Sequence, residues 1–153
     1  MHWLVLLSFF SCPLFCVDQL LYHGSLTDGI ERLTPRVRFT PGEELSSPAG
    51  IYASDLPAFA AAHSFPWFSA EGIDLFVEDG IVVLEIPASL AERLDTPVYM
   101  YFVDGLLFSL LECESTGHTF RATEAVDCLD KIRFDSVTEA IEHYQGLVVI
   151  KES

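Results

Sequence analysis

The chain has 153 residues, half of them apolar, and its 8 basic and 23 acidic residues give a formal net charge of −15. This length and apolar content are enough to bury one hydrophobic core, which argues against a disordered protein. An acidic surface repels phosphate backbones, because nucleic-acid affinity comes largely from basic groups that displace counterions. We therefore expect one compact acidic domain, for which nucleic acid is a poor candidate partner.

The first 17 residues, MHWLVLLSFFSCPLFCV, form an apolar block without Lys, Arg, Asp or Glu. The block is short for a membrane span and close in length to the apolar region of a signal peptide, although only the terminal amine supplies positive charge. Three interpretations stay open: an export signal, an uncleaved anchor or apolar N-terminal element, and a mistaken start site. We expect a secreted or membrane-associated protein whose membrane contact is limited to residues 1–17, with a cytoplasmic protein as the alternative.

Residues 18–153 are expected to form the folded domain, beginning with a strand over DQLLYHG (18–24). Residues 27–29 lead into a short amphipathic turn with Ile30 and Leu33 on one side. Residues 34–50 hold three prolines and two glycines and predict a loop. The basic cluster Arg32, Arg36 and Arg38 is either solvated surface or a local contact for a phosphate.

The segment IYAS (51–54) predicts a short strand, and the following DLPAFAAAHSF (55–65) predicts a helix from its alanine content and apolar spacing. Ser54 or Asp55 is the expected helix cap, because short oxygen-bearing side chains accept the unpaired N–H groups of a first turn.

Two hairpins are predicted next, over residues 73–86 and 98–112, with turns at Asp79-Gly80 and Asp104-Gly105. An Asp-Gly dipeptide between apolar strands suits a tight type I′ turn. The rest of the chain predicts a helical turn between the hairpins, two strands, a helix and a closing strand, over 89–94, 118–122, 131–134, 136–144 and 146–151.

Two of these segments carry a resemblance. LYHGS (21–25), followed by the turn, the loop and GIYASDLPAFAAAHS (50–64), resembles the opening of the ADP-ribosyltransferase superfamily. The similarity is to its histidine–tyrosine–glutamate branch, which includes diphtheria-toxin-like and poly-ADP-ribose-polymerase-like enzymes. It implies an α+β fold with a split β-sheet core and short helices, and an enzyme that uses NAD as a substrate.

Carried over residue by residue, the resemblance implies that His23 hydrogen-bonds the NAD ribose and that Gly24 offers its backbone to the nicotinamide amide. Tyr52 would stack on the nicotinamide ring, and Ser25 and Ser54 would complete the cofactor-binding set. The stretch RATEAVDCLDKIRF (121–134) resembles the one that carries the acidic residue in several compact members, so Glu124 is the candidate catalytic residue.

The implied roles make physical sense. Cleavage of the bond between nicotinamide and ribose develops positive charge on the sugar, and a nearby carboxylate such as Glu124 stabilises that charge or orients the nucleophile. An aromatic face such as Tyr52 attracts a cationic ring. The leading expectation is transfer of ADP-ribose from NAD to a protein or small-molecule acceptor that the sequence does not name.

Alternative functions stay open. One is a catalytically inactive NAD-binding or interaction module of the same fold, and another is a structural secreted protein. A third is a Cys-His hydrolase in which Cys113 or Cys128 is the nucleophile and His118 or His143 the base, although no known signature surrounds either cysteine. The same two cysteines form either a disulfide or a reduced pair, and their spacing suggests no metal site.

Overall fold

A computed structural model describes residues 19–38, 47–64, 71–111 and 117–152. This part of the chain is mixed α/β, mostly strands with a few short helices, in agreement with the expected α+β class at a coarse level. Its strands are β1 (Leu20–Ser25), β2 (Arg32–Leu33), β3 (Arg36–Arg38), β4 (Ser47–Ser54), β5 (Asp74–Glu78), β6 (Ile81–Pro87), β7 (Val98–Asp104), β8 (Ser109–Leu110), β9 (Thr119–Ala122), β10 (Val126–Asp127), β11 (Asp130–Phe134) and β12 (Leu147–Lys151). Its helices are α1 (Pro57–Ala62), α2 (Val137–His143) and the 3-10 helices η4 (Ala88–Asp95) and η5 (Gly105–Leu107).

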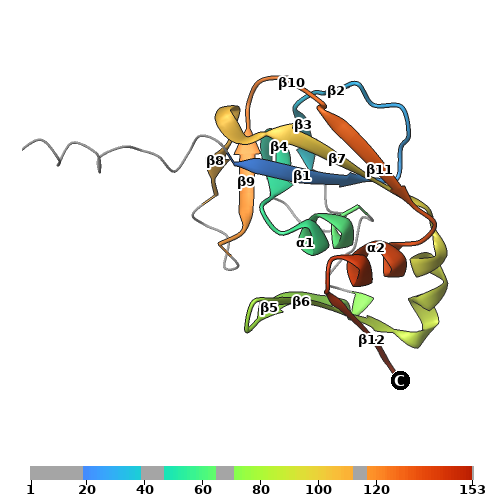
Figure 1. Cartoon of the computed structure of the whole chain (residues 1–153). Coiled ribbons are helices and arrows are strands. Elements are labelled where there is room, and N and C mark those ends of the chain that lie inside the picture. Colours follow the sequence, from blue (N-terminus) through green and yellow to red (C-terminus); the bar gives the residue numbers. More distant parts are fainter. Residues whose placement is uncertain (1–18, 39–46, 65–70, 112–116, 153) are drawn as a thin grey trace, which may run out of the picture.

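The strands form two main sheets with the helices between them. The larger sheet is antiparallel and has the order β11-β7-β1-β4-β9-β8, with β3 paired to β4. The smaller sheet has the order β12-β6-β5, and β12 runs parallel to β6. Figure 1 shows α1 and α2 in a layer between the two sheets. The short β2–β10 pair belongs to neither sheet.

Apolar side chains fill both sides of the larger sheet. One cluster joins α1 and α2 to both sheets, and it includes the fully buried Leu84, Met100 and Ile141. A second cluster, which includes Leu21 and Val103, lies between the larger sheet and the β2–β10 pair. Because the sheet is covered on both faces, the strands that carry the site residues are held in fixed positions.

The larger sheet opens between β1 and β4. Strand β1 pairs with β7 along its whole length, from Leu20↔Asp104 to Ser25↔Tyr99, but it pairs with β4 only at Tyr22↔Ser54. No described strand pairs with the β4-facing edge of β1 beyond that point. The two strands therefore diverge where the His-Gly-Ser segment begins.

The backbone of Gly24 faces this opening. The carbonyl of Gln19, the residue just before β1, accepts the N–H of Gly105 at 2.9 Å, so it points toward β7. Backbone polar groups of alternate residues point to opposite sides of an antiparallel strand. It follows that His23 is hydrogen-bonded toward β7, whereas the N–H and C=O of Gly24 point toward the β4 side.

One predicted hairpin is confirmed and the other is wrong. Strands β5 and β6 pair across Asp79 and Gly80, whose φ values of 52° and 79° are those of a type I′ turn. At Asp104-Gly105, however, the chain enters η5, and β8 pairs with β9 instead of β7. The Asp104 side chain accepts the N–H of Leu106 at 3.0 Å, and this local bond stabilises the 3-10 turn.

The segment between β1 and β4 also differs from expectation. The predicted amphipathic turn is an irregular stretch that ends in β2, although Ile30 and Leu33 do pack on the same apolar cluster. The predicted loop over 34–50 contains β3 and the first half of β4, while residues 39–46 lie outside the described part. Tertiary pairing between β3 and β4 overrides the loop signal of the prolines.

The cap expected for α1 is also corrected. Its N-cap is Leu56, which has no side-chain cap bond. Ser54 Oγ instead accepts the N–H of Leu56 at 3.0 Å, in the turn that leads into the helix. Pro57 then begins the helix, at a position where no N–H is needed. The later elements over 89–94, 118–122, 131–134, 136–144 and 146–151 are confirmed as η4, β9, β11, α2 and β12. Among the described helices, none is long and apolar enough to span a membrane.

Candidate functional site

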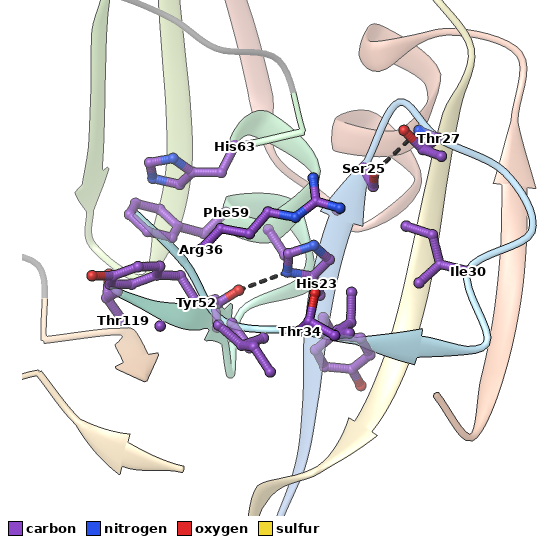
Figure 2. Close-up of a pocket in the computed structure, with 18 of the residues that line it drawn as sticks. His23, Ser25, Thr27, Ile30, Thr34, Arg36, Tyr52, Phe59, His63 and Thr119 are labelled. Carbon is purple, nitrogen blue, oxygen red and sulfur yellow. Dashed lines mark hydrogen bonds between the residues drawn. The ribbon is translucent and has the colours of Figure 1, made fainter. Parts of the chain in front are cut away.

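A pocket of about 290 Å³ lies at the opening between β1 and β4. Its volume is near the lower end of the range for ligand pockets, roughly 300–1,000 Å³. The lining comes from β1 to β4, α1 and β9, and Figure 2 shows these side chains grouped around the pocket. All five residues that the resemblance assigned to cofactor binding line this pocket: His23, Gly24, Ser25, Tyr52 and Ser54.

His23 is anchored by a hydrogen bond across the opening. Its Nδ1 lies 2.7 Å from the backbone oxygen of Tyr52 (Figure 2). A carbonyl oxygen only accepts, so Nδ1 carries the proton and donates it. In the neutral ring Nε2 is then the acceptor nitrogen. This tautomer can receive a hydrogen bond from a hydroxyl group at Nε2.

Gly24 brings α1 close to β1. A Cβ at this position would lie 2.2 Å from the Ala60 backbone oxygen and 3.1 Å from Ser64 Cβ. The space that a side chain would need at Gly24 is therefore filled by the helix and by Ser64, which follows it. The backbone edge of Gly24 faces the β4 side of the opening.

Aromatic rings form one side of the pocket. Figure 2 shows Tyr52, Phe59 and His63 along this side, and the Phe59 and His63 ring centroids are 4.6 Å apart in an edge-to-face arrangement. Phe59 is buried, Tyr52 is half-buried and His63 is exposed, so the wall runs from the interior to the mouth. Such a wall can bind a flat ring by stacking.

The two serines have local backbone partners as well as places in the lining. Ser25 Oγ accepts the N–H of Thr27 at 3.1 Å, and Ser54 Oγ accepts the N–H of Leu56. Both bonds stabilise the turns that follow the strands. The segment after β1 is further fixed by the buried Tyr101, whose hydroxyl donates to the Thr27 carbonyl at 2.6 Å and accepts the N–H of Ile30 at 3.2 Å.

Glu124 lies apart from this arrangement. It is an exposed residue in the bend between β9 and β10, and it does not line the pocket. The lining residue from β9 is Thr119, which is buried and pairs with Ser54. The described lining contains no Asp or Glu at all. The catalytic role of Glu124 therefore stays a prediction that the position of the residue does not support.

Comparison with protein-family models, with curated proteins and with solved structures finds no match for this chain. The described residues also contain no group of three His, Cys, Asp or Glu side chains that could hold a metal ion.

In the described part of the chain, the two histidines named for a Cys-His hydrolase contact other side chains. His118 Nδ1 lies 2.9 Å from Asp55 Oδ1, and the His143 ring packs against the rings of Phe134 and Tyr144. Cys113 lies outside the described residues. Cys128 is a half-buried free thiol whose pKa is raised by burial and by the nearby Asp127 carboxylate. A raised pKa lowers the thiolate fraction, the opposite of what a nucleophile requires.

We expect Cys128 to react slowly with iodoacetamide at pH 7, because its raised pKa keeps it protonated, and to react faster only as the pH rises above the ordinary thiol range. The measurement is a timed alkylation followed by mass spectrometry of the peptide that contains Cys128, with an unstructured cysteine peptide as the control. Faster alkylation of Cys128 than of the control at pH 7 would contradict this assignment and revive the hydrolase alternative.

Several pocket residues were not among the predicted site residues. Phe59 and His63 are four residues apart and project from one face of the expected helix, so their spacing was a usable signal once Tyr52 was placed beside that helix. Arg36 was singled out only as part of a basic cluster in a predicted loop. No local signal placed Thr34 in the site, because the pairing of β3 with β4 brings this segment to the pocket.

Proposed function

We propose that this chain binds NAD in the pocket between β1 and β4, as a protein of ADP-ribosyltransferase type. The observation that carries the proposal is the contact between the two motif segments: His23 of HGS donates to the backbone of Tyr52 of YAS at 2.7 Å, beside the diverging edge of β1. Two short motifs 29 residues apart in the chain thus form one side of a single pocket.

Each part of the pocket suits one part of the ligand. The Gly24 backbone edge can pair with the nicotinamide amide, which has both a donor and an acceptor. The Tyr52 ring attracts the cationic nicotinamide, with a gain of roughly 0.5–2 kcal/mol. The acceptor nitrogen of His23 can receive a ribose hydroxyl, which positions the sugar without moving a proton.

ADP-ribose transfer to a protein or small-molecule acceptor is the reaction that we propose for bound NAD, and it needs a carboxylate near the ribose. Glu124 was the expected residue, but it does not line the pocket, while Glu112 and Glu114 lie outside the described residues. The geometry therefore supports NAD binding more strongly than turnover. A NAD-binding module without transferase activity is the second candidate, favoured by the absence of Asp and Glu from the described lining.

Two measurements on the same protein separate these candidates. Titration calorimetry with NAD is expected to show saturable binding, and a nicotinamide-release assay then reports turnover. If Glu124 is catalytic, Glu124→Gln lowers release by on the order of a hundredfold while NAD binding persists, because only transition-state stabilisation is lost.

The variants Glu112→Gln and Glu114→Gln are the matched controls. If one of these variants, and not Glu124→Gln, loses nicotinamide release, the catalytic carboxylate is assigned to that residue. If the unmodified chain binds NAD but releases no nicotinamide, the transferase is excluded and the inactive NAD-binding module remains. If the chain does not bind NAD, both candidates are refuted.

A further inference from the structure

The charges in the pocket have the opposite sign to those of the whole protein. The chain carries a formal net charge of −15, yet the charged side chains in the described lining are the two cations Arg32 and Arg36. An anion that approaches such an acidic protein is repelled unless it meets a local positive group. The pocket provides this group at its mouth.

Of the two arginines, Arg36 is the better placed to meet a ligand. Arg32 is in β2, and its Nε lies 3.7 Å from Oδ1 of Asp127 on the neighbouring β10. Arg36 is in β3 and pairs with Gly50 of β4, two residues before Tyr52 on the same strand. Among the described residues, Arg36 forms no ion pair with a carboxylate.

Arg36 also lies beside the ring-binding part of the pocket. Residues two apart on a strand point to the same face, so the pairing with Gly50 puts Arg36 on the face that carries Tyr52. In Figure 2 the Arg36 side chain extends across the pocket, with its guanidinium group on the side of His23. The side chain is exposed, so it can meet a ligand without a change in the fold.

We propose that Arg36 binds a phosphate group of the ligand and makes this pocket selective for a phosphate-bearing nucleotide over an uncharged ring compound. The inference rests on the proposed NAD site and adds a specificity-determining residue to it. A guanidinium group offers two parallel N–H donors that match two phosphate oxygens, and such charge-assisted hydrogen bonds are stronger than neutral ones. The pyrophosphate of a dinucleotide would then lie at the mouth, beyond the aromatic wall.

The test is titration calorimetry of the full chain with four separate probes: NAD, ADP-ribose, nicotinamide and inorganic pyrophosphate. We expect Arg36→Gln to weaken NAD and ADP-ribose binding by roughly tenfold or more, which is what the loss of a hydrogen bond to a charged group costs. Nicotinamide binding should stay within about twofold, since nicotinamide lacks phosphate, and Arg36→Lys should restore part of the loss.

The control is Arg133→Gln, which removes the same charge from an exposed arginine of β11 that pairs with Asp135. Equal losses in the Arg36 and Arg133 variants, or no loss in the Arg36 variant, would overturn the inference. Pyrophosphate binding as tight as ADP-ribose binding would overturn the selectivity for a nucleotide. Thermal melting of each variant checks that the fold is retained.

The outcomes also separate this inference from the NAD proposal. If the unmodified chain binds ADP-ribose through Arg36 but binds neither NAD nor nicotinamide, the NAD proposal fails and the phosphate contact stands. If NAD binds with the same affinity with and without Arg36, the NAD proposal stands and the phosphate contact fails. If no phosphate-bearing probe binds to the unmodified chain, the phosphate contact is refuted.

Discussion

Replacing Gly24 with alanine is expected to lower the free energy of unfolding by about 2–3 kcal/mol, a cost typical of overpacking a filled interior. The new methyl group would lie 2.2 Å from the Ala60 oxygen and 3.0 Å from the Ala60 carbonyl carbon, both in the backbone of α1. A helix backbone cannot rotate away as a side chain can, so α1 would have to move off β1. The measurement is urea unfolding of the variant and of the unmodified chain.

Gly50→Ala is the control, because Gly50 also lines the pocket but is crowded mainly by a flexible side chain. Its Cβ would lie 2.6 Å from Cγ of Arg121, which can change rotamer. We expect a clearly smaller loss of stability at Gly50 than at Gly24. Equal stability of the Gly24 variant and the unmodified chain would contradict the close packing of α1 on β1.

Removing the His23 ring is expected to weaken NAD binding by roughly ten- to a hundredfold, which corresponds to about 1.4–2.8 kcal/mol. His23→Ala deletes both the bond to the Tyr52 carbonyl and the acceptor nitrogen for the ribose. His23→Asn separates the two roles, because an asparagine amide can still donate to the Tyr52 carbonyl but has no atom in the place of Nε2. Calorimetry on both variants measures the effect.

Tyr52→Ala and Tyr52→Phe are the companion variants. The alanine variant loses the stacking face and should bind NAD several-fold more weakly, whereas the phenylalanine variant keeps the ring and should bind almost as the unmodified chain does. Unchanged NAD affinity in His23→Asn would mean that the histidine serves only to join β1 to β4. Unchanged affinity in Tyr52→Ala would remove the tyrosine from the ligand site.

The comparison of the two Asp-Gly turns shows what local sequence can and cannot predict. Asp79-Gly80 lies between strands that pair with each other, so the turn signal was sufficient. At Asp104-Gly105 the same dipeptide follows a strand whose partners are β1 and β11, and the Gly105 N–H bonds to the distant Gln19 carbonyl. A Cβ on Gly105 would lie 2.6 Å from that oxygen, so the glycine is needed for packing instead of for a hairpin.

In the candidate site, too, local sequence predicts some features and strand pairing determines the others. The segments that carry His23 and Tyr52 were predictable as strand ends, because their apolar runs stop at small and polar residues. The places of Arg36 and Thr119 depend on the pairing of β3 and β9 with β4, which no local pattern encodes. Glu124 was chosen from a short local similarity, and the pairing that brings Thr119 to the pocket leaves Glu124 at an exposed bend.

The most direct test of the NAD site is a crystal structure of the chain soaked with NAD at saturating concentration. The account predicts nicotinamide density between the Tyr52 ring and the Gly24 backbone, with a ribose hydroxyl within hydrogen-bond distance of His23 Nε2. Density for NAD elsewhere on the protein, or an empty pocket in crystals that leave its mouth open, would contradict it.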